Sequence, residues 1–204
     1  ENQANFLSTI RSNVDRMATL VSDLTDVSRI EAGRIRLDFT TVPVSEVVDE
    51  VVRSIRNQIT EKEQQLDVNI PPDLPAMWGD RVRLIQIITN LVSNAYKYTP
   101  AQGQIIVKAE LTNQTSTQGS AQVIHLTVSD NGYGITPDHQ KNIFQKFYRS
   151  DDPKVRDTPG TGLGLNISKQ LIELQGGQIW FESVYRSGSS FHITVPIAEI
   201  QPSK

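Results

Sequence analysis

The stretch QIITNLVSNAYKYTP, residues 86–100, combines an apolar helix face with a polar stripe. Asp80 can cap the helix that contains it, and the core-facing residues of that helix would be Leu84, Ile87, Ile88, Leu91 and Val92. Asn90 and Asn94 lie four residues apart and Lys97 follows three later, so these three share one face. Two amide oxygens and an ammonium can hold a metal ion and phosphate oxygens. The alternative is a solvated helix face.

Helices and strands alternate irregularly around this stretch, as judged from hydrophobic periodicity and turn residues. Helices are expected at 3–32, 45–58 (capped by Ser45), 80–96, 136–147 and 163–175, and strands at 35–39, 66–70, 104–111, 123–129, 179–185 and 190–196. The polar stretch 112–122 is predicted to be a mobile hairpin loop, and the charged stretch 150–159 a loop. This order predicts an α/β (α+β) fold, a two-layer sandwich of a mixed sheet with helices on one face, preceded by one long helix.

The first helix carries two apolar lines, which predicts two helical partners in a bundle. One line consists of Leu7, Ile10, Val14, Met17, Val21 and Leu24, and the other of Phe6, Leu20 and Val27. No partner helix of similar length lies next to it in the sequence, and Gly33 is the expected stop.

Composition sets limits on the partners. The net charge of −3 argues against a nucleic-acid partner, and the absence of cysteine excludes disulfides and thiolate metal sites. No apolar run reaches the ~18–20 residues of a membrane span. Because the chain opens with Glu1 inside a helical pattern, we interpret it as a cytoplasmic fragment whose parent could be anchored in a membrane.

Two glycine-rich stretches are candidate ligand loops. DNGYGI, residues 130–135, follows a strand, and a carboxylate at Asp130 can accept a hydrogen bond from an exocyclic amine; a plain turn is the alternative. GTGLGL, residues 160–165, opens a helix, whose free N–H groups can bind an anion. Phe144 and Phe147 favour core packing, but Arg149 follows them and could reach phosphate oxygens.

In this order the stretches resemble the catalytic and ATP-binding domain of sensor histidine kinases, in the superfamily of gyrase, Hsp90 and MutL with a Bergerat-type fold. Residues 86–100 resemble the N box, 130–135 the first glycine box, IFQKFYR at 143–149 the F box and GTGLGLNISKQLIELQGG at 160–177 the second glycine box. Residues 14–37 are similar to the second helix of the dimerisation and histidine-phosphotransfer hairpin. The implied domains are 1–34 (the second helix of a truncated phosphotransfer domain) and 35–204 (the catalytic domain).

The resemblance implies roles for individual residues. Asp130 would bind the adenine amino group, and Asn94, with Asn90, would hold Mg²⁺ on the phosphates of ATP. Lys97 and Arg149 would contact phosphate, and Asn90, Asn94, Lys97 and Arg149 form the implied catalytic set. The remaining implied nucleotide contacts are Tyr98, Gly132, Gly134, Ile135, Tyr148, Gly160, Thr161, Gly162, Leu163, Gly164 and Leu165. Residues 148–160 would form a lid over the phosphates.

The resemblance also implies the reaction, transfer of the ATP γ-phosphoryl to a histidine and then to a response-regulator aspartate. No Glu-Leu-Arg-Thr-Pro run follows a histidine here, and His125, His139 and His192 are interpreted as structural or surface residues. The acceptor helix would lie upstream, and the full-length protein is expected to form a homodimer. The alternatives are an ATP hydrolase, which would need a glutamate where Gln86 stands, and a nucleotide-binding scaffold.

Overall fold

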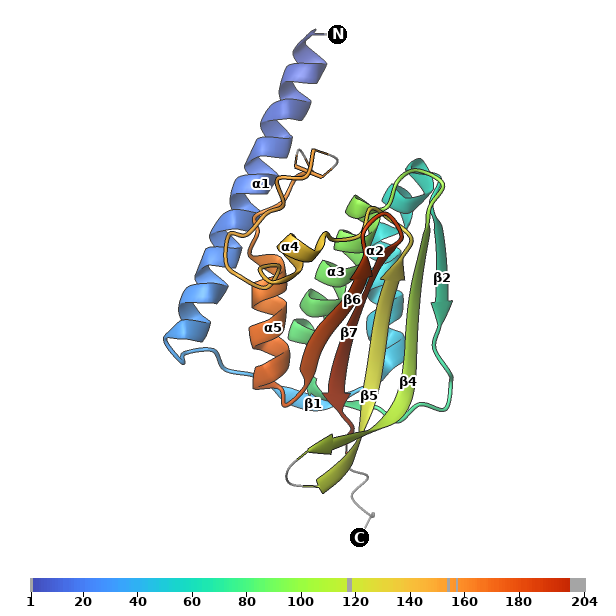
Figure 1. The fold of residues 1–204 in the computed structure, drawn as a ribbon. Helices are drawn as coiled ribbons and strands as arrows, with labels where there is room; N and C mark the ends of the chain where they lie inside the picture. Colours follow the sequence, from blue (N-terminus) through green and yellow to red (C-terminus); the bar gives the residue numbers. More distant parts are fainter. Residues whose placement is uncertain (1, 117–118, 154, 157, 199–204) are drawn as a thin grey trace.

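The computed structural model describes residues 2–116, 119–153, 155–156 and 158–198, and a five-stranded sheet forms one layer of the molecule (Figure 1). Its strand order is β2-β4-β5-β7-β6, with β2 parallel to β4 and the other neighbours antiparallel. The strands are β2 (Gln65–Asn69), β4 (Gln104–Ser116), β5 (Gly119–Asp130), β6 (Gln178–Val184) and β7 (Gly188–Pro196). The predicted mixed sheet is therefore confirmed.

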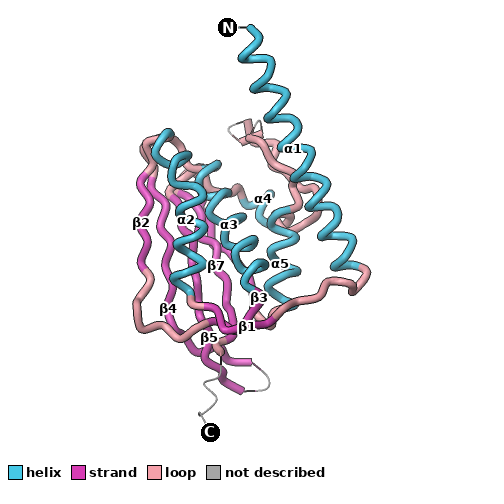
Figure 2. The backbone as a smooth tube through the Cα atoms, turned by 180° about the vertical axis from the view of Figure 1, so that it is seen from behind, coloured by secondary structure: helices cyan, strands magenta, loops and turns pink. Residues whose placement is uncertain are grey.

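Three helices form the second layer and lie together on one face of the sheet (Figure 2). They are α2 (Val44–Glu61), α3 (Arg81–Tyr98) and α5 (Gly164–Leu174). Each turns its apolar stripe inward, so residues such as Val48, Ile88 and Leu171 are buried against the strands. No helix of the described residues covers the opposite face of the sheet (Figure 1). Helices on one face were predicted, and this is confirmed.

A small second sheet closes one end of the sandwich. It pairs β1 (Phe39–Val42) with β3 (Met77–Asp80) in antiparallel register. The prediction of a strand at 35–39 was wrong in position, because pairing begins only at Phe39, opposite Asp80. Strand β3 was not predicted, because its four residues are too few to show a clear hydrophobic period.

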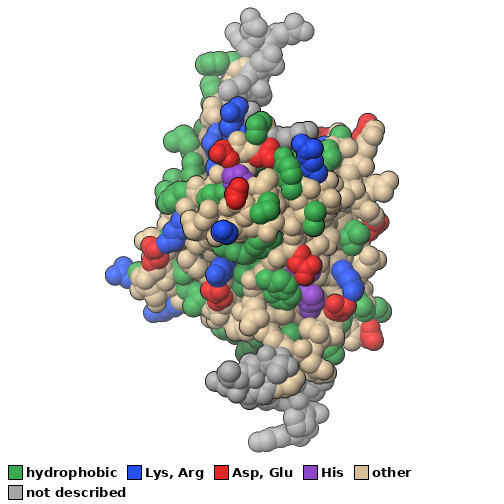
Figure 3. Space-filling model, in the orientation of Figure 1, with side chains coloured by type: hydrophobic (Ala, Val, Ile, Leu, Met, Phe, Trp, Pro, Cys, Tyr) green, Lys and Arg blue, Asp and Glu red, His purple; other side chains and the backbone are tan. Residues whose placement is uncertain are grey.

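The first helix, α1 (Asn2–Glu31), runs past the sandwich at its N-terminal end (Figure 1). It ends as predicted at Gly33, which adopts a φ of 61°, with Arg34 N donating to Arg29 O at 2.8 Å. Val27 is buried, whereas most of the two predicted apolar lines is exposed, as green side chains beside α1 in Figure 3 illustrate. The exposed members are Phe6, Ile10, Val14, Met17, Val21 and Leu24; the side chain of Leu7 lies outside the described residues.

Three local predictions were wrong. The stretch 112–122 is not a loop, because β4 and β5 stay in register as far as Ser116 opposite Gly119; residues 117–118 lie outside the described residues. The helix expected at 136–147 is only α4 (Pro137–Gln140), and turns follow up to Phe147, whose φ is +61°. The predicted cap of α2 at Ser45 is also wrong, because Val44 begins the helix and Pro43 is the N-cap residue.

Within the described part of the chain, no helix combines the length and apolar character needed to cross a membrane.

Candidate functional site

A cavity of about 480 Å³ lies between α3, α5, the ends of β5 and β7, and the described residues of the segment 148–162. This segment extends the expected lid, 148–160, by two residues and is called the lid from here on. This volume falls in the range of pockets that hold small molecules and cofactors. Two residues of α1, Thr19 and Asp23, also line it. The cavity is therefore lined both by the sandwich and by the first helix.

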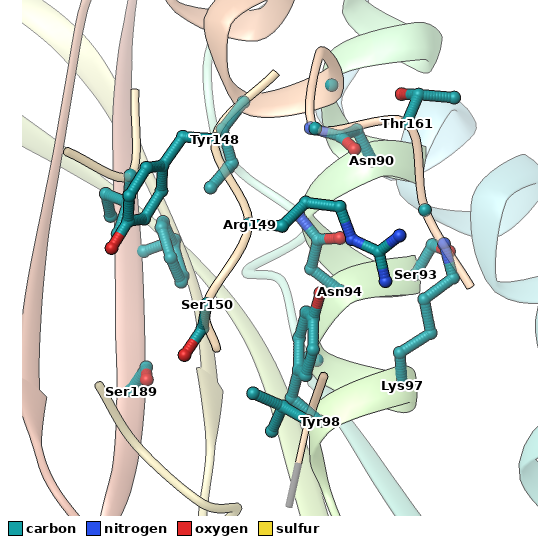
Figure 4. Close-up of a pocket in the computed structure, with 18 of the residues that line it drawn as sticks. Asn90, Ser93, Asn94, Lys97, Tyr98, Tyr148, Arg149, Ser150, Thr161 and Ser189 are labelled. Atoms are coloured by element: carbon teal, nitrogen blue, oxygen red, sulfur yellow. The ribbon is translucent and has the colours of Figure 1, made fainter. Parts of the chain in front are cut away.

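The polar stripe of α3 forms one wall, and its side chains are drawn along the helix in Figure 4. The helix begins at Asp80 as predicted, whose side chain accepts a hydrogen bond from Arg83 N at 3.1 Å. Because Leu91 and Val92 face the sheet, Asn90, Asn94 and Lys97 must face away from it. Burial lowers the pKa of Lys97, and the nearby carboxylate of Asp23 partly offsets that shift.

Asn90 is oriented by α5. Its Nδ2 donates to Ser168 Oγ at 2.9 Å. Its Oδ1 lies 2.3 Å from the position that a Cβ on Gly164 would occupy. The amide oxygen therefore lies beside the first turn of α5, where backbone N–H groups are free.

Asp130 stands at the end of β5, opposite Ser189 of β7, and lines the cavity. Its Oδ1 accepts a hydrogen bond from Gly132 N at 2.8 Å. Burial raises the pKa of Asp130 to about 6, and backbone hydrogen bonds from Gly132 and Ser189 limit the rise. A partly buried carboxylate with spare acceptor capacity suits an amine donor on a ligand.

The loop after Asp130 leaves no room for larger side chains. A Cβ on Gly132 would lie 2.3 Å from Tyr98 O, and one on Gly134, whose φ is +65°, would lie 2.1 Å from Val184 O. Tyr133 N donates to Tyr98 O at 3.1 Å. This close fit brings the glycine loop directly against the end of α3.

The lid is held by side chains. Arg149 Nη2 donates to Arg156 O at 2.9 Å and to Thr158 O at 2.6 Å, so the guanidinium ties the lid to itself. Thr161 Oγ1 donates to Asp23 Oδ2 at 2.8 Å, which joins the lid to α1. Burial raises the pKa of Asp23.

A second polar cluster fixes α1 to α3. Asp26 is buried, and both of its carboxylate oxygens accept from Arg83 Nη1 at 3.1 Å. Gln86 Nε2 donates to Asp26 Oδ2 at 2.8 Å. An ion pair between Lys146 and Glu31 adds a contact near the end of α1. Removing one partner of such a buried ion pair lowers the stability of the folded protein, because the other charge is left unpaired.

The cavity gathers nearly all of the residues singled out in the sequence. Asn90, Asn94, Lys97, Tyr98, Asp130, Gly134, Ile135, Tyr148, Arg149, Gly160, Thr161, Gly162, Gly164 and Leu165 all line it. Two do not: Leu163 is fully buried in the core, and Gly132 is buried beneath Tyr98 O. His125 and His192 stack with Trp180 on β5, β7 and β6, while His139 lies at the cavity beside Tyr148.

Several lining residues were not predicted. Ser93 lies three residues after Asn90 and four before Lys97, so the helix stripe could have included it. Ser189 could have been found only from its pairing with Asp130. Thr19 and Asp23 line the cavity because α1 packs against the lid. No local sequence pattern predicts that contact.

The described residues contain no group of three or more acidic or histidine side chains that could hold a metal ion. The available donors are instead the amide oxygens of Asn90 and Asn94. Such a set fits Mg²⁺ only when a ligand's phosphates and water supply the remaining oxygens.

The chain resembles proteins of known family. The family model described as "Histidine kinase-, DNA gyrase B-, and HSP90-like ATPase" matches residues 79–199. Sensor protein GacS of Pseudomonas syringae is 34% identical over 203 residues, which cover 99% of this chain and 22% of GacS. BarA of Escherichia coli, a signal transduction histidine-protein kinase, is 35% identical over 199 residues, which cover 96% of this chain and 21% of BarA. The chain thus spans about a fifth of the length of these two relatives.

Solved structures give the same assignment. Full-length ShkA in complex with AMPPNP superposes with a TM-score of 0.78 at 26% identity, covering 97% of this chain and 39% of ShkA. The catalytic domain of histidine kinase ThkA gives a TM-score of 0.65 at 27% identity, covering 78% of this chain and 96% of that domain. The chain therefore belongs to the histidine kinase-, DNA gyrase B- and HSP90-like ATPase family, in which it is an ATP-binding kinase core of the sensor histidine kinase type.

Proposed function

We propose that the cavity binds Mg-ATP and presents the γ-phosphoryl group to a histidine on another helix. The observation that carries this proposal is the arrangement of the cavity, with the carboxylate of Asp130 beside the end of β5 and the stripe of Asn90, Asn94 and Lys97 along α3. One region suits an adenine amino group and the other suits phosphates.

Each wall has a separate task in this proposal. Asp130 accepts the amine hydrogen bond, and the close-fitting glycine loop lets the base approach the backbone. Asn90 and Asn94 offer amide oxygens to Mg²⁺, which would neutralise phosphate charge when bound. Lys97 contacts phosphate oxygens directly. Phosphoryl transfer depends on such positioning and charge neutralisation rather than on covalent help from the protein.

A kinase role is favoured over ATP hydrolysis by the position of Gln86. A hydrolase of this superfamily would need a carboxylate there to activate water, and Gln86 is an amide that donates to Asp26 and accepts from Arg83 at 2.8 Å. An amide cannot take a proton from water at neutral pH.

The larger context is also a proposal. Residues 1–34 would be the second helix of a dimerisation and phosphotransfer domain, and residues 35–204 the catalytic domain. The exposed apolar residues of α1 support a helical partner there. The acceptor histidine would belong to a helix of the parent protein, which would pass the phosphoryl group to a response regulator in the cytoplasm.

Calorimetric titration with Mg²⁺ and AMPPNP tests nucleotide binding, with Asp130→Asn as the matched variant that loses the carboxylate. We expect saturable binding by the natural chain and much weaker binding by the variant. Incubation with γ-labelled ATP should leave no stable label on this chain by itself. No binding by the natural chain would refute the proposal, and sustained phosphate release would favour the hydrolase.

A further inference from the structure

Lys62 places its ammonium group at the C-terminal end of α3. It is the C-cap residue of α2, and its Nζ donates to three backbone carbonyls: Tyr96 O at 2.8 Å, Lys97 O at 3.3 Å and Thr99 O at 2.6 Å. The same Nζ lies 4.9 Å from the centroid of the Tyr96 ring. An ammonium group has three N–H donors, so these carbonyls use all of its capacity.

The reason for this arrangement lies in the helix end. The last carbonyls of a helix have no partner within the helix and carry partial negative charge, which favours a cation. Gln64 also binds this end of α3. Its Nε2 lies within hydrogen-bonding distance of Tyr96 O at 3.1 Å, Thr99 O at 2.7 Å and Pro100 O at 3.2 Å. Two side chains from beyond the end of α2 therefore hold the last turn of α3.

That turn is also part of the nucleotide cavity. Lys97 and Tyr98 both line the cavity, and Tyr98 O accepts from Tyr133 N at 3.1 Å in the glycine loop. Gly132 packs against the same Tyr98 carbonyl. One helical turn thus has the Lys62 ammonium bound to its carbonyls and the glycine loop packed against it.

We propose that Lys62 is a positioning residue for the nucleotide. Its ammonium occupies a cation site built from the carbonyls of Tyr96, Lys97 and Thr99, and so fixes where Lys97 and Tyr98 meet the ligand. This inference rests on the nucleotide-binding function proposed above. The site has a specific chemical consequence: a small monovalent cation should be able to replace the ammonium, because carbonyl oxygens are the ligands that such ions use in proteins.

Two variants separate this role from general packing. Lys62→Ala removes the ammonium and opens space beside the three carbonyls, whereas Lys62→Met keeps the stem and blocks that space. Calorimetry with Mg²⁺ and AMPPNP should show affinity reduced about tenfold in both, or about 1.4 kcal/mol. Ammonium chloride or potassium chloride, but not choline chloride of equal ionic strength, should restore most of the affinity of Lys62→Ala and none of that of Lys62→Met.

Lys108→Ala is the matched control, because Lys108 is exposed on β4 and pairs with Glu110 outside the cavity. Melting curves of the chain without nucleotide give a second readout. Ammonium should raise the melting temperature of Lys62→Ala more than choline does, and if this variant folds only in ammonium, that result supports the site directly.

Two results would overturn the inference: natural affinity in both Lys62 variants, or a loss in Lys62→Ala that ammonium does not reverse. Failure of the natural chain to bind AMPPNP would instead refute the proposed function. The melting-temperature comparison would still test the cation site in that case.

Discussion

The floor and the lid of the cavity are held by different kinds of contact. The floor, formed by α3 and the loop 130–135, is joined by backbone groups, such as Tyr133 N on Tyr98 O. The lid, residues 148–162, has backbone hydrogen bonds of its own, such as Arg156 N on Asp152 O, but its described contact with α1 is made by the side chain of Thr161, and Arg149 ties the lid to itself. The floor therefore has one arrangement fixed by the fold, while the lid depends on a few hydrogen bonds that a ligand can exchange for its own.

The glycines show the same contrast. A Cβ on Gly132 would meet backbone atoms of Tyr98 within 3 Å, whereas one on Gly160 would meet nothing within 4 Å. Glycine is required by space in the floor and is not required by space at the start of the second glycine box. This difference is confined to Gly160. Later in the second glycine box, a Cβ on Gly162, whose φ is +72°, would lie 2.8 Å from Phe147 C, and one on Gly164 would lie 2.3 Å from Asn90 Oδ1.

The largest expected effect comes from Gly132→Ala. The new methyl group would lie 2.3 Å from Tyr98 O, so one of the two backbones must shift, which strains the hydrogen bond from Tyr133 N to Tyr98 O. We expect the free energy of unfolding to fall by about 3 kcal/mol, measured by urea titration.

Gly160→Ala is the matched substitution in the lid. Its free energy of unfolding should stay within about 0.5 kcal/mol of the natural value, because an added methyl at an open position is tolerated. Equal losses in the two variants would show that the floor and the lid do not differ as described.

A smaller effect is expected from Asp130→Asn in the chain without nucleotide. Burial raises the pKa of Asp130 in the folded state from 3.8 to about 6. Between these values the folded state binds more protons than the unfolded state, so stability falls as pH rises from about 4 to about 6. The loss at neutral pH is on the order of 2–3 kcal/mol, at about 1.4 kcal/mol for each unit of the rise. The asparagine variant carries no such charge and should avoid this loss.

Melting temperatures of both proteins between pH 4 and pH 7 measure this difference. The variant should melt higher at pH 7, and the gap should close toward pH 4, while the variant binds AMPPNP poorly throughout. A gap that does not depend on pH would mean that ionisation of Asp130 is not its cause. With the expected result, the substitution stabilises the floor at pH 7 and weakens nucleotide recognition.

The smallest effect is expected from Asp23→Asn, which acts on the lid. Asp23 lines the cavity near Lys97 and accepts from Thr161. Removing its negative charge should favour phosphates, so affinity for Mg-AMPPNP should rise about threefold, a change typical of partly exposed charges. Glu173→Gln, an equal charge change on an exposed residue of α5, is the calorimetric control. Weaker binding by Asp23→Asn would show that this carboxylate supports the ligand.

The sequence was most informative where one element carried both a core face and a functional face. On α3, the cap at Asp80 and the buried Ile87, Ile88 and Leu91 left only one direction for Asn90 and Asn94. The mixed sheet and its one-sided helices followed from the order of the periodic segments. These features are local, because each depends on residues within a few turns of one another.

Features that depend on distant partners were not predicted. The contact between Thr161 and Asp23 joins residues 138 positions apart, and the Lys62 site joins the ends of two helices. In the β4–β5 hairpin only the outer part, residues 112–122, was predicted to be a loop, because it is polar, although the register continues to Ser116. Tertiary pairing decided the structure in these places, and local propensity did not.

The presence of α1 in the cavity wall has a thermodynamic consequence. Thr19 and Asp23 belong to the first helix, so the docked helix and a bound nucleotide share one site. Coupling between two binding equilibria is reciprocal. If moving α1 away from the lid changes nucleotide affinity by a given factor, nucleotide binding changes the docking equilibrium of α1 by that same factor. The helix therefore lines the cavity, and its docking is linked to nucleotide binding there.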